Sequence, residues 1–149
     1  MHWACMRLAD MGPLAVYELL ALRSAVFVVE QQCVYLDPDG LDALCWHLAG
    51  RWDGQLQACA RLVPPRIKGQ AQPMIGRVVT APNARGRGQG RALMLQALDE
   101  CARLWPGEAV EIQAQAHLHD FYASLGFVAI SDRYDEDGIA HIDMRRVSP

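Results

Sequence analysis

The chain has 149 residues, of which 52% are hydrophobic, and this is enough to build one domain around a buried core. The N-terminal stretch MHWACMRLAD lacks the basic start and long apolar run of a signal peptide, and no apolar stretch is long enough to span a bilayer. No repeat, low-complexity tract or linker divides the chain. We therefore predict a single cytoplasmic domain over residues 1–149.

The net charge of −3 is unevenly distributed along the chain. Residues 55–97, here called the basic window, contain seven Lys or Arg residues and no Asp or Glu, which gives this window a charge of +7. The remainder has 7 basic and 17 acidic residues and a charge of −10. This asymmetry indicates one face for an anionic ligand and another for a neutral or cationic one.

The pattern of apolar and turn residues predicts alternating helices and strands. Residues 2–8 alternate loosely and favour a first strand. Gly12-Pro13 opens a helix that runs to about Val29, since proline is accepted in the first turn. An Asp-, Pro- and Gly-rich loop follows at 30–42. Residues 43–65 then favour a hairpin, with Asp53-Gly54 as the turn signal.

The second half of the chain continues the alternation. The predicted elements are a strand at 74–81 ended by Pro82, a helix from about Gly88 to Leu104 stopped by Pro106-Gly107, a strand at 109–115, a short helix at 117–127 closed by Gly126, and a final pair of strands at 128–134 and 140–147 across an acidic turn.

Three glycines and three arginines lie in the segment PNARGRGQGRAL, residues 82–93, between a predicted strand and a predicted helix. The first N–H groups of a helix have no internal partner and lie at the positive end of the helix dipole. Glycines allow a phosphate to approach such a backbone closely. The first turn offers Arg85, Arg87 and Arg91 where acidic residues are favoured, so we expect a ligand to supply the negative charge.

Two common phosphate motifs fit this segment poorly. A P-loop requires a Lys-Ser/Thr pair after its glycines, and none is present. A dinucleotide motif G-x-G-x-x-G begins at Gly86 and Gly88, but Arg91 occupies the third glycine position. Glu111 lies about 20 residues on, as a ribose-binding acid would, so this reading stays open as an alternative.

The segment RGRGQG at 85–90 matches R/Q-x-x-G-x-G/A, and HLHDFYASLGF at 117–127 contains F-Y-x-x-x-G-F. Together with FVVEQQCVYLDPDG and YDEDGIAHIDM, these segments resemble the GNAT (GCN5-related) N-acetyltransferase superfamily, in its ElaA-like branch. The resemblance implies an α/β fold whose mixed, mostly antiparallel central sheet is flanked by helices, in the order β-α-α-β-β-β-α-β-α-β-β. It also implies an acyltransferase of the EC 2.3.1 class.

The implied activity is acetyl-CoA-dependent transfer of an acetyl group to a primary amine of a small molecule or peptide, by direct attack in a ternary complex. The strand edge would pair with pantetheine, and a backbone N–H of Val79 or Thr80 would polarise the thioester carbonyl. The loop would hold the pyrophosphate, and Gln115 stands where many members carry the Asn that contacts pantetheine. The implied acetyl-CoA-binding residues are Val78, Val79, Thr80, Arg85, Gly86, Arg87, Gly88, Gln89, Gly90 and Gln115.

The resemblance also suggests catalytic residues. Tyr122 would act as general acid, or hydrogen bond the CoA sulfur, although a tyrosine ring can equally pack in the core. Glu30, at the end of the first helix, would take the ammonium proton through water or bind the cation. Histidines titrate near neutral pH, and His117 leads them as a candidate because it adjoins the cofactor-binding helix, ahead of His47 and His141.

Acidic residues, histidines and cysteines bear on the acceptor and on metal binding. Two acidic groups, Asp37, Asp39 and Asp42 and then Asp135, Glu136 and Asp137, would flank the acceptor cleft and favour a cationic amine such as a polyamine, an aminoglycoside, or a lysine or N-terminal amine. His117 and His119 face different sides of a helix, and the five cysteines have wide spacing without C-x-x-C, so we predict free cysteines and no metal.

The sequence also bears on alternative functions and on partners. A non-catalytic acyl-CoA-binding or sensing module of the same fold is the alternative to an enzyme. Nucleic-acid binding is disfavoured because the basic window has no Phe, Tyr or Trp for base stacking and the net charge is negative. No membrane partner is expected. Dimers are common among such folds, so a homodimer stays open.

Overall fold

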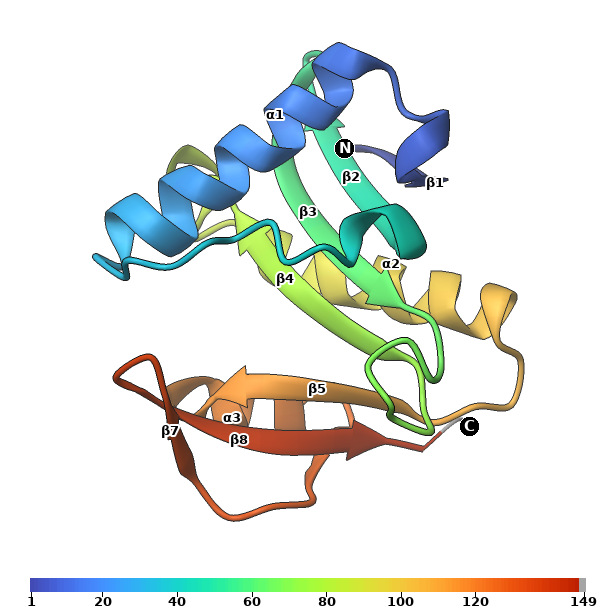
Figure 1. Ribbon diagram of the computed structural model, residues 1–149, viewed down its shortest axis with the longest axis vertical. Helices are drawn as coiled ribbons and strands as arrows, with labels where there is room; N and C mark the ends of the chain where they lie inside the picture. The colour runs from blue at the N-terminus through green and yellow to red at the C-terminus, as the bar shows by residue number, and fades with distance from the viewer. Residues whose placement is uncertain (148–149) are drawn as a thin grey trace.

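The strands from the first half of the chain form one antiparallel end of the sheet in the computed structural model, which describes residues 1–147. They are β1 (His2–Arg7), β2 (Trp46–Trp52), β3 (Gln55–Val63) and β4 (Met74–Thr80) (Figure 1). The turn between β2 and β3 is Asp53-Gly54, and both residues have the positive φ that this turn requires. The hairpin prediction is therefore confirmed.

The other end of the sheet comes from the second half of the chain. It contains β5 (Val110–Gln115), β6 (Val128–Ala129), β7 (Tyr134–Glu136) and β8 (Ile139–Arg146). The strand order is β1-β2-β3-β4-β5-β8-β6, with β7 paired to β8, and only β4 and β5 are parallel. This is the mixed, mostly antiparallel sheet that we expected.

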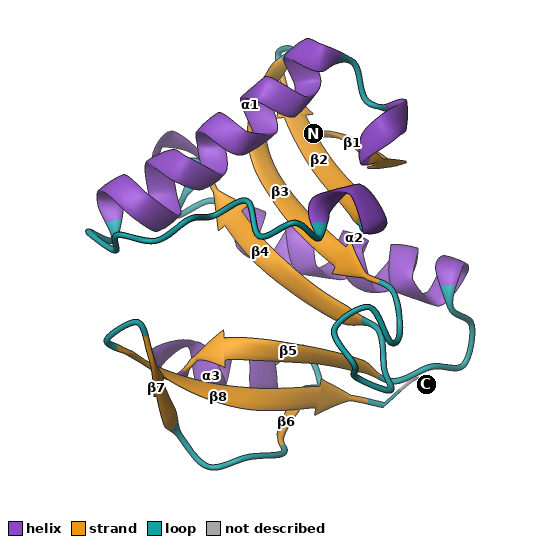
Figure 2. Cartoon of the chain, in the orientation of Figure 1, coloured by secondary structure: helices purple, strands orange, loops and turns teal. Residues whose placement is uncertain are grey.

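Helices cover both faces of the sheet (Figures 1 and 2). On one face α1 (Pro13–Arg23) crosses β3 and β4 and passes directly into the π-helical segment η2 (Ser24–Glu30). On the other face lie α2 (Gln89–Leu104) and α3 (His119–Ala123). Four single turns of 3-10 helix complete the elements: η1 (Leu8–Asp10), η3 (Asp42–Leu44), η4 (Pro82–Ala84) and η5 (Ala116–Leu118).

Two details differ from the expected element order. The two helices expected before the second strand are continuous, because the chain has no glycine or proline between Leu14 and Glu30 to separate them. The strand expected at 128–134 is split into β6 and β7. The Asp143 amide donates a hydrogen bond to the Ser131 hydroxyl at 2.9 Å. In a continuous pair of strands this amide would donate to a backbone carbonyl instead.

The larger hydrophobic core lies between the sheet and the helices α2 and α3. The apolar face of α2 supplies Leu93, Met94, Ala97, Leu98 and Cys101 to it. A smaller cluster beneath α1 joins Leu19 and Val26 to Cys59 and Val79 of the sheet. All five cysteines are free, and burial raises the pKa of Cys59 and Cys101 to about 12. These two thiols are therefore neutral packing groups.

Among residues 1–147, no helix is both long and apolar enough to cross a membrane.

The parallel contact between β4 and β5 is short. The two strands are paired only at Met74 and Glu111, where the Glu111 amide donates to the Pro73 carbonyl at 3.0 Å. Beyond this contact the strands diverge toward their carboxyl ends, as Figure 1 shows. The sheet is therefore continuous where β4 and β5 begin and open where they end.

Candidate active site

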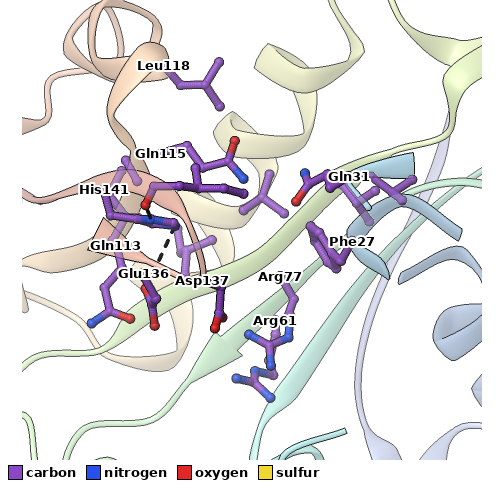
Figure 3. A pocket seen from close by; sticks show the side chains of 18 of the residues that line it. Phe27, Gln31, Arg61, Arg77, Gln113, Gln115, Leu118, Glu136, Asp137 and His141 are labelled. Atoms are coloured by element: carbon purple, nitrogen blue, oxygen red, sulfur yellow. Dashed lines mark hydrogen bonds and ion pairs between the residues drawn. The ribbon is translucent and has the colours of Figure 1, made fainter. Parts of the chain in front are cut away.

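A cleft of about 820 Å³ occupies the opening between β4 and β5. Its walls come from η2 and the following loop, from β4, from β5 and α3, and from the β7–β8 turn (Figure 3). A bulge in β4 helps to form it. Between the pairs Cys59–Val79 and Arg61–Gly76, β3 has one residue and β4 has two, and Arg77 in this bulge has a φ of 48°. A bulge increases local twist and directs a strand away from its neighbour.

The backbone of β4 presents different polar groups at Val79 and Thr80. The Ala81 amide donates to the Gln57 carbonyl at 2.7 Å, and hydrogen-bonded and non-bonded pairs alternate along an antiparallel ladder. The polar groups of Val79 therefore face β3, and those of Thr80 face the cleft. Consistent with this direction, Arg85 Nε donates to the Thr80 carbonyl at 3.3 Å.

The loop before α2 has the features of an anion site. Gly86 and Gly88 have φ values of 79° and 73°, and Gly88 is the N-cap of α2. No side chain caps this helix, and its first turn contains no acidic residue. A Cβ on Gly88 would meet nothing within 4 Å, so the backbone conformation, not the space, favours glycine here. The N–H groups of the first turn are thus directed outward for a ligand.

The structure brings many of the predicted acetyl-CoA-binding residues together. Those that line the cleft are Val78, Val79, Thr80, Arg85, Gly90 and Gln115. The remaining ones, Gly86, Arg87, Gly88 and Gln89, lie in the exposed loop and first turn beside it.

Tyr122 both packs in the core and lines the cleft. Its residue is 7% exposed, and its ring makes edge-on contacts with Phe121 and Phe127 at centroid distances of 5.1 and 5.9 Å. Burial raises the pKa of Tyr122 to about 12. The phenol is therefore neutral at physiological pH. Its hydroxyl keeps its proton and can donate or accept a hydrogen bond.

Glu30 lies on the cleft but is engaged in an ion pair. Its Oε1 is 2.7 Å from Nη1 of Arg85, and both side chains are 40% exposed. The predicted acceptor-site carboxylate and a predicted phosphate-binding arginine therefore neutralise one another in this structure.

The three candidate histidines occupy different environments. His117 is exposed on η5 at the rim of the cleft. His47 is buried in β2, where Nε2 is 2.8 Å from the Asp42 carbonyl and burial lowers the pKa of the ring, so it is a structural residue. His141, on β8, lines the cleft opposite Gln115.

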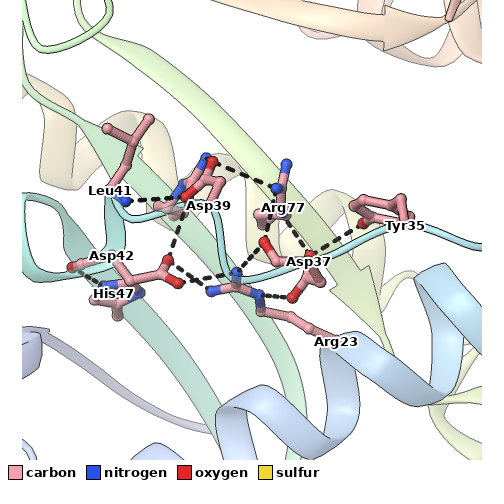
Figure 4. A network of polar contacts seen from close by, with 9 residues as sticks. Arg23, Tyr35, Asp37, Asp39, Leu41, Asp42, His47 and Arg77 are labelled. Atoms are coloured by element: carbon pink, nitrogen blue, oxygen red, sulfur yellow. Dashed lines mark hydrogen bonds and ion pairs between the residues drawn. The ribbon is translucent and has the colours of Figure 1, made fainter. Parts of the chain in front are cut away.

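The expected acidic acceptor loop is largely neutralised by arginines (Figure 4). Arg23 donates to Asp37 and Asp42, each at 2.8 Å, and both carboxylates are buried. The six residues Arg23, Asp37, Asp39, Asp42, Arg61 and Arg77 form one network, here called the Asp–Arg cluster.

This cluster corrects two expectations from the sequence. Asp37 and Asp42 do not face the cleft as free carboxylates, and only Asp39 of the three lines it. Arg61 and Arg77 belong to the basic window, yet they pair with this loop and not with an external anion. Arg23, the buried centre of this network, was not singled out from the sequence. Its position four residues after Leu19 on the buried face of α1 was a sequence signal for a buried anionic partner.

In the second acidic group, Glu136 and Asp137 line the cleft, whereas Asp135 accepts the Gly138 amide. Within residues 1–147, no group of three His, Cys, Asp or Glu side chains is arranged to hold a metal ion.

The sheet thus opens between two parallel strands, with the glycine-rich N-terminus of α2 beside the opening. The chain belongs to the family described as "Acetyltransferase (GNAT) domain", which matches residues 51–148. Its relatives include a UPF0039 protein of Synechocystis, 46% identical over 96% of this chain and 93% of the relative. Another is the protein ElaA of Escherichia coli, 40% identical over 97% and 95%.

Solved structures agree with this assignment. An acyl-CoA N-acyltransferase from Pseudomonas aeruginosa is 48% identical with a TM-score of 0.93, covering 98% of this chain and 99% of that one. E. coli ElaA is 39% identical with a TM-score of 0.91, covering 97% and 98%. An aminoglycoside 6'-N-acetyltransferase complexed with coenzyme A shares the fold at 13% identity and a TM-score of 0.73. The GNAT and ElaA-like predictions are thus confirmed.

Proposed function

We propose that this protein is an N-acetyltransferase that moves the acetyl group of acetyl-CoA to a primary amine of a small molecule or peptide. The observation that carries the proposal is the position of the cleft. One opening between β4 and β5 is lined by Thr80 and Tyr122 and lies beside the loop that carries the Gly88 N-cap. These are the parts needed to hold a phosphate, a thioester and a leaving thiolate.

The residues present fit acetyl-CoA along its length. The N–H groups at the start of α2 would bind the pyrophosphate, and Arg87 and Arg85 would supply positive charge nearby. The exposed edge of β4 and the Gln115 amide would pair with pantetheine. The Thr80 N–H would then donate to the thioester carbonyl and stabilise the oxyanion that forms on attack.

Tyr122 would donate a hydrogen bond to the departing sulfur. A phenol with a pKa of about 12 is a weaker acid than an alkyl thiol, whose pKa is about 8.5, so it stabilises a thiolate without becoming a phenolate itself. The amine would enter from the end of the cleft bordered by Glu136 and Asp137. Their negative charge favours a cationic acceptor.

Two measurements test this function. Titration calorimetry with acetyl-CoA measures binding, and free-thiol release measures turnover with spermidine, kanamycin, Nα-acetyl-lysine and a tripeptide with a free N-terminus. We expect binding and amine-dependent release. Binding without release by any amine would instead support the non-catalytic acyl-CoA-binding module. The cytoplasmic location and a homodimer remain predictions from the sequence, and gel filtration tests the latter.

A further inference from the structure

His141 has a defined place at the acceptor end of the cleft. It lies on β8 and is paired in register with Gln115, the last residue of β5. Its side chain is 14% exposed, so the ring is held largely within the wall of the cleft. Figure 3 shows it between Gln115 and Glu136. It thus lies beside the strand end that leads into η5 and α3, the helix of Tyr122.

The contacts of the ring fix its tautomer. His141 Nδ1 is 2.8 Å from the carbonyl oxygen of Ile139. A carbonyl oxygen can only accept, so Nδ1 carries the hydrogen, and in the neutral ring the lone pair is on Nε2. The ring also stacks on Tyr134, with centroids 6.0 Å apart and planes at 25°. The basic nitrogen of the imidazole, Nε2, is therefore directed away from β8.

A carboxylate lies near the basic nitrogen of the ring. Oε2 of Glu136 is 3.9 Å from His141 Nε2. The other titratable groups on this side are Asp137 in the turn, Tyr134 on β7 and Asp143 on β8, and β5 contributes the neutral Gln115. The Tyr134 hydroxyl donates to Asp143, which occupies both groups. Glu136 is thus the carboxylate placed to stabilise an imidazolium and to attract an ammonium group.

We propose that His141 is the catalytic base that deprotonates the acceptor amine, with Glu136 positioning and stabilising it. This inference rests on the proposed acetyltransfer. An ammonium N–H proton passes to Nε2, and the freed amine attacks the thioester carbon, so that a C–N bond forms and the C–S bond breaks. The second proton from nitrogen reaches the departing sulfur through water, while the Tyr122 hydroxyl keeps its proton and donates a hydrogen bond to that sulfur. The products are the amide, the CoA thiol and the imidazolium, which returns its proton to water.

The other base candidates are less well prepared. The ring of His117 is exposed at the rim. The carboxylate of Glu30 is already paired with Arg85 at 2.7 Å. His141 alone among these three combines a fixed tautomer with a place on the cleft wall, and a neutral imidazole is suited to accept a proton near pH 7.

The test compares His141→Asn and His141→Ala with the wild-type protein. An Asn amide can keep the hydrogen bond to the Ile139 carbonyl but has no basic nitrogen. We expect the rate of amine-dependent thiol release from acetyl-CoA, with the fastest amine of the four-amine panel above, to fall about 100-fold or more in both variants. The Kd for acetyl-CoA should stay within about twofold. Added imidazole should restore part of the rate to His141→Ala only.

Nitrogen NMR of the wild-type rings provides a readout that does not depend on the acceptor. We expect a protonated Nδ1 and an unprotonated Nε2 in the neutral ring of His141, and the opposite tautomer would overturn the proposal. The control variant for the rate measurement is His2→Gln, because His2 is exposed on β1 at the opposite edge of the sheet. It should retain the wild-type rate.

The outcomes separate this inference from the proposed function. If wild-type protein releases thiol and His141→Asn does so at the same rate, His141 is not the base, although the enzyme stands. If acetyl-CoA does not bind, or binds without any thiol release, the acetyltransfer itself is refuted and the base role is refuted with it.

Discussion

Glu30 and Arg85 form an ion pair of 2.7 Å between the end of η2 and the loop that precedes α2. The two residues would serve different halves of the proposed reaction, because Arg85 would bind the phosphates of CoA and Glu30 the amine. Bound pyrophosphate would compete with Glu30 for the same guanidinium. The arrival of acetyl-CoA would therefore release a carboxylate toward the acceptor side of the cleft.

Replacing Glu30 by Gln should tighten CoA binding about two- to fivefold at low salt, since Arg85 no longer has a competing partner. An exposed ion pair is worth up to about 1 kcal/mol, which sets this range. Calorimetry with CoA gives the measurement. Glu18→Gln is the matched control, because Glu18 pairs with Arg51 at 3.1 Å away from the cleft. Weaker binding by Glu30→Gln would mean that Glu30 does not compete for Arg85.

Replacing Tyr122 by Phe should lower kcat about 100-fold and leave thermal stability nearly unchanged. The ring keeps its edge-on contacts with Phe121 and Phe127, and only the hydroxyl that would face the sulfur is removed. Thiol release and a thermal melt measure the two effects. Tyr122→Leu serves as the comparison, since it should also destabilise the fold by removing the aromatic contacts. Full turnover in Tyr122→Phe would exclude this hydroxyl from the reaction.

Replacing Gly88 by Ala should weaken CoA binding about tenfold or more. Both Gly88 and Gly54 have a positive φ, 73° and 76°, and both have open space around an added Cβ. Either substitution should therefore cost about 1 kcal/mol of stability from backbone strain. Gly54 lies in the β2–β3 turn, so Gly54→Ala should bind CoA normally. Equal CoA affinity in the two variants would show that the N-cap of α2 does not hold the pyrophosphate.

The Asp–Arg cluster should make stability fall in acid. Burial opposes the charged forms of Asp39 and Asp42, but hydrogen bonds and positive charge from Arg61 and Arg23 outweigh it and lower the pKa of both carboxyls. A lowered folded-state pKa adds stability above the unfolded value of about 3.9, and this contribution is lost as the pH falls below it. Urea unfolding between pH 7 and pH 2 should show that loss.

A variant identifies the cluster as the source of this acid sensitivity. Asp42→Asn should cost about 3–5 kcal/mol at pH 7, because it leaves Arg23 and Arg61 short of a buried partner. The difference from wild type should shrink toward pH 2. Asp99→Asn, at an exposed position of α2, is the control and should change little. A pH-independent difference would place the acid sensitivity elsewhere.

Local patterns were sufficient for most of the elements of this fold. Gly88 was recognisable as the start of a helix and Gly126 as the end of one, because both signals depend on backbone conformations of single residues. The Asp53-Gly54 turn was likewise predictable. The split between β6 and β7 was not, since it depends on a hydrogen bond from Asp143 to Ser131, twelve residues away.

The sequence by itself determined the kind of protein: the order of strands and helices, the glycine loop, the tyrosine motif and the GNAT family. Each of these features depends on residues that are close together in the sequence. Only the tertiary structure decided which charges remain available. It pairs Arg61 and Arg77 with the acidic loop, directs the backbone N–H of Thr80 and not that of Val79 into the cleft, and pairs His141 with Gln115. Coulomb and hydrogen-bond energies depend on distances of a few ångströms, which are set by packing between segments far apart in the chain.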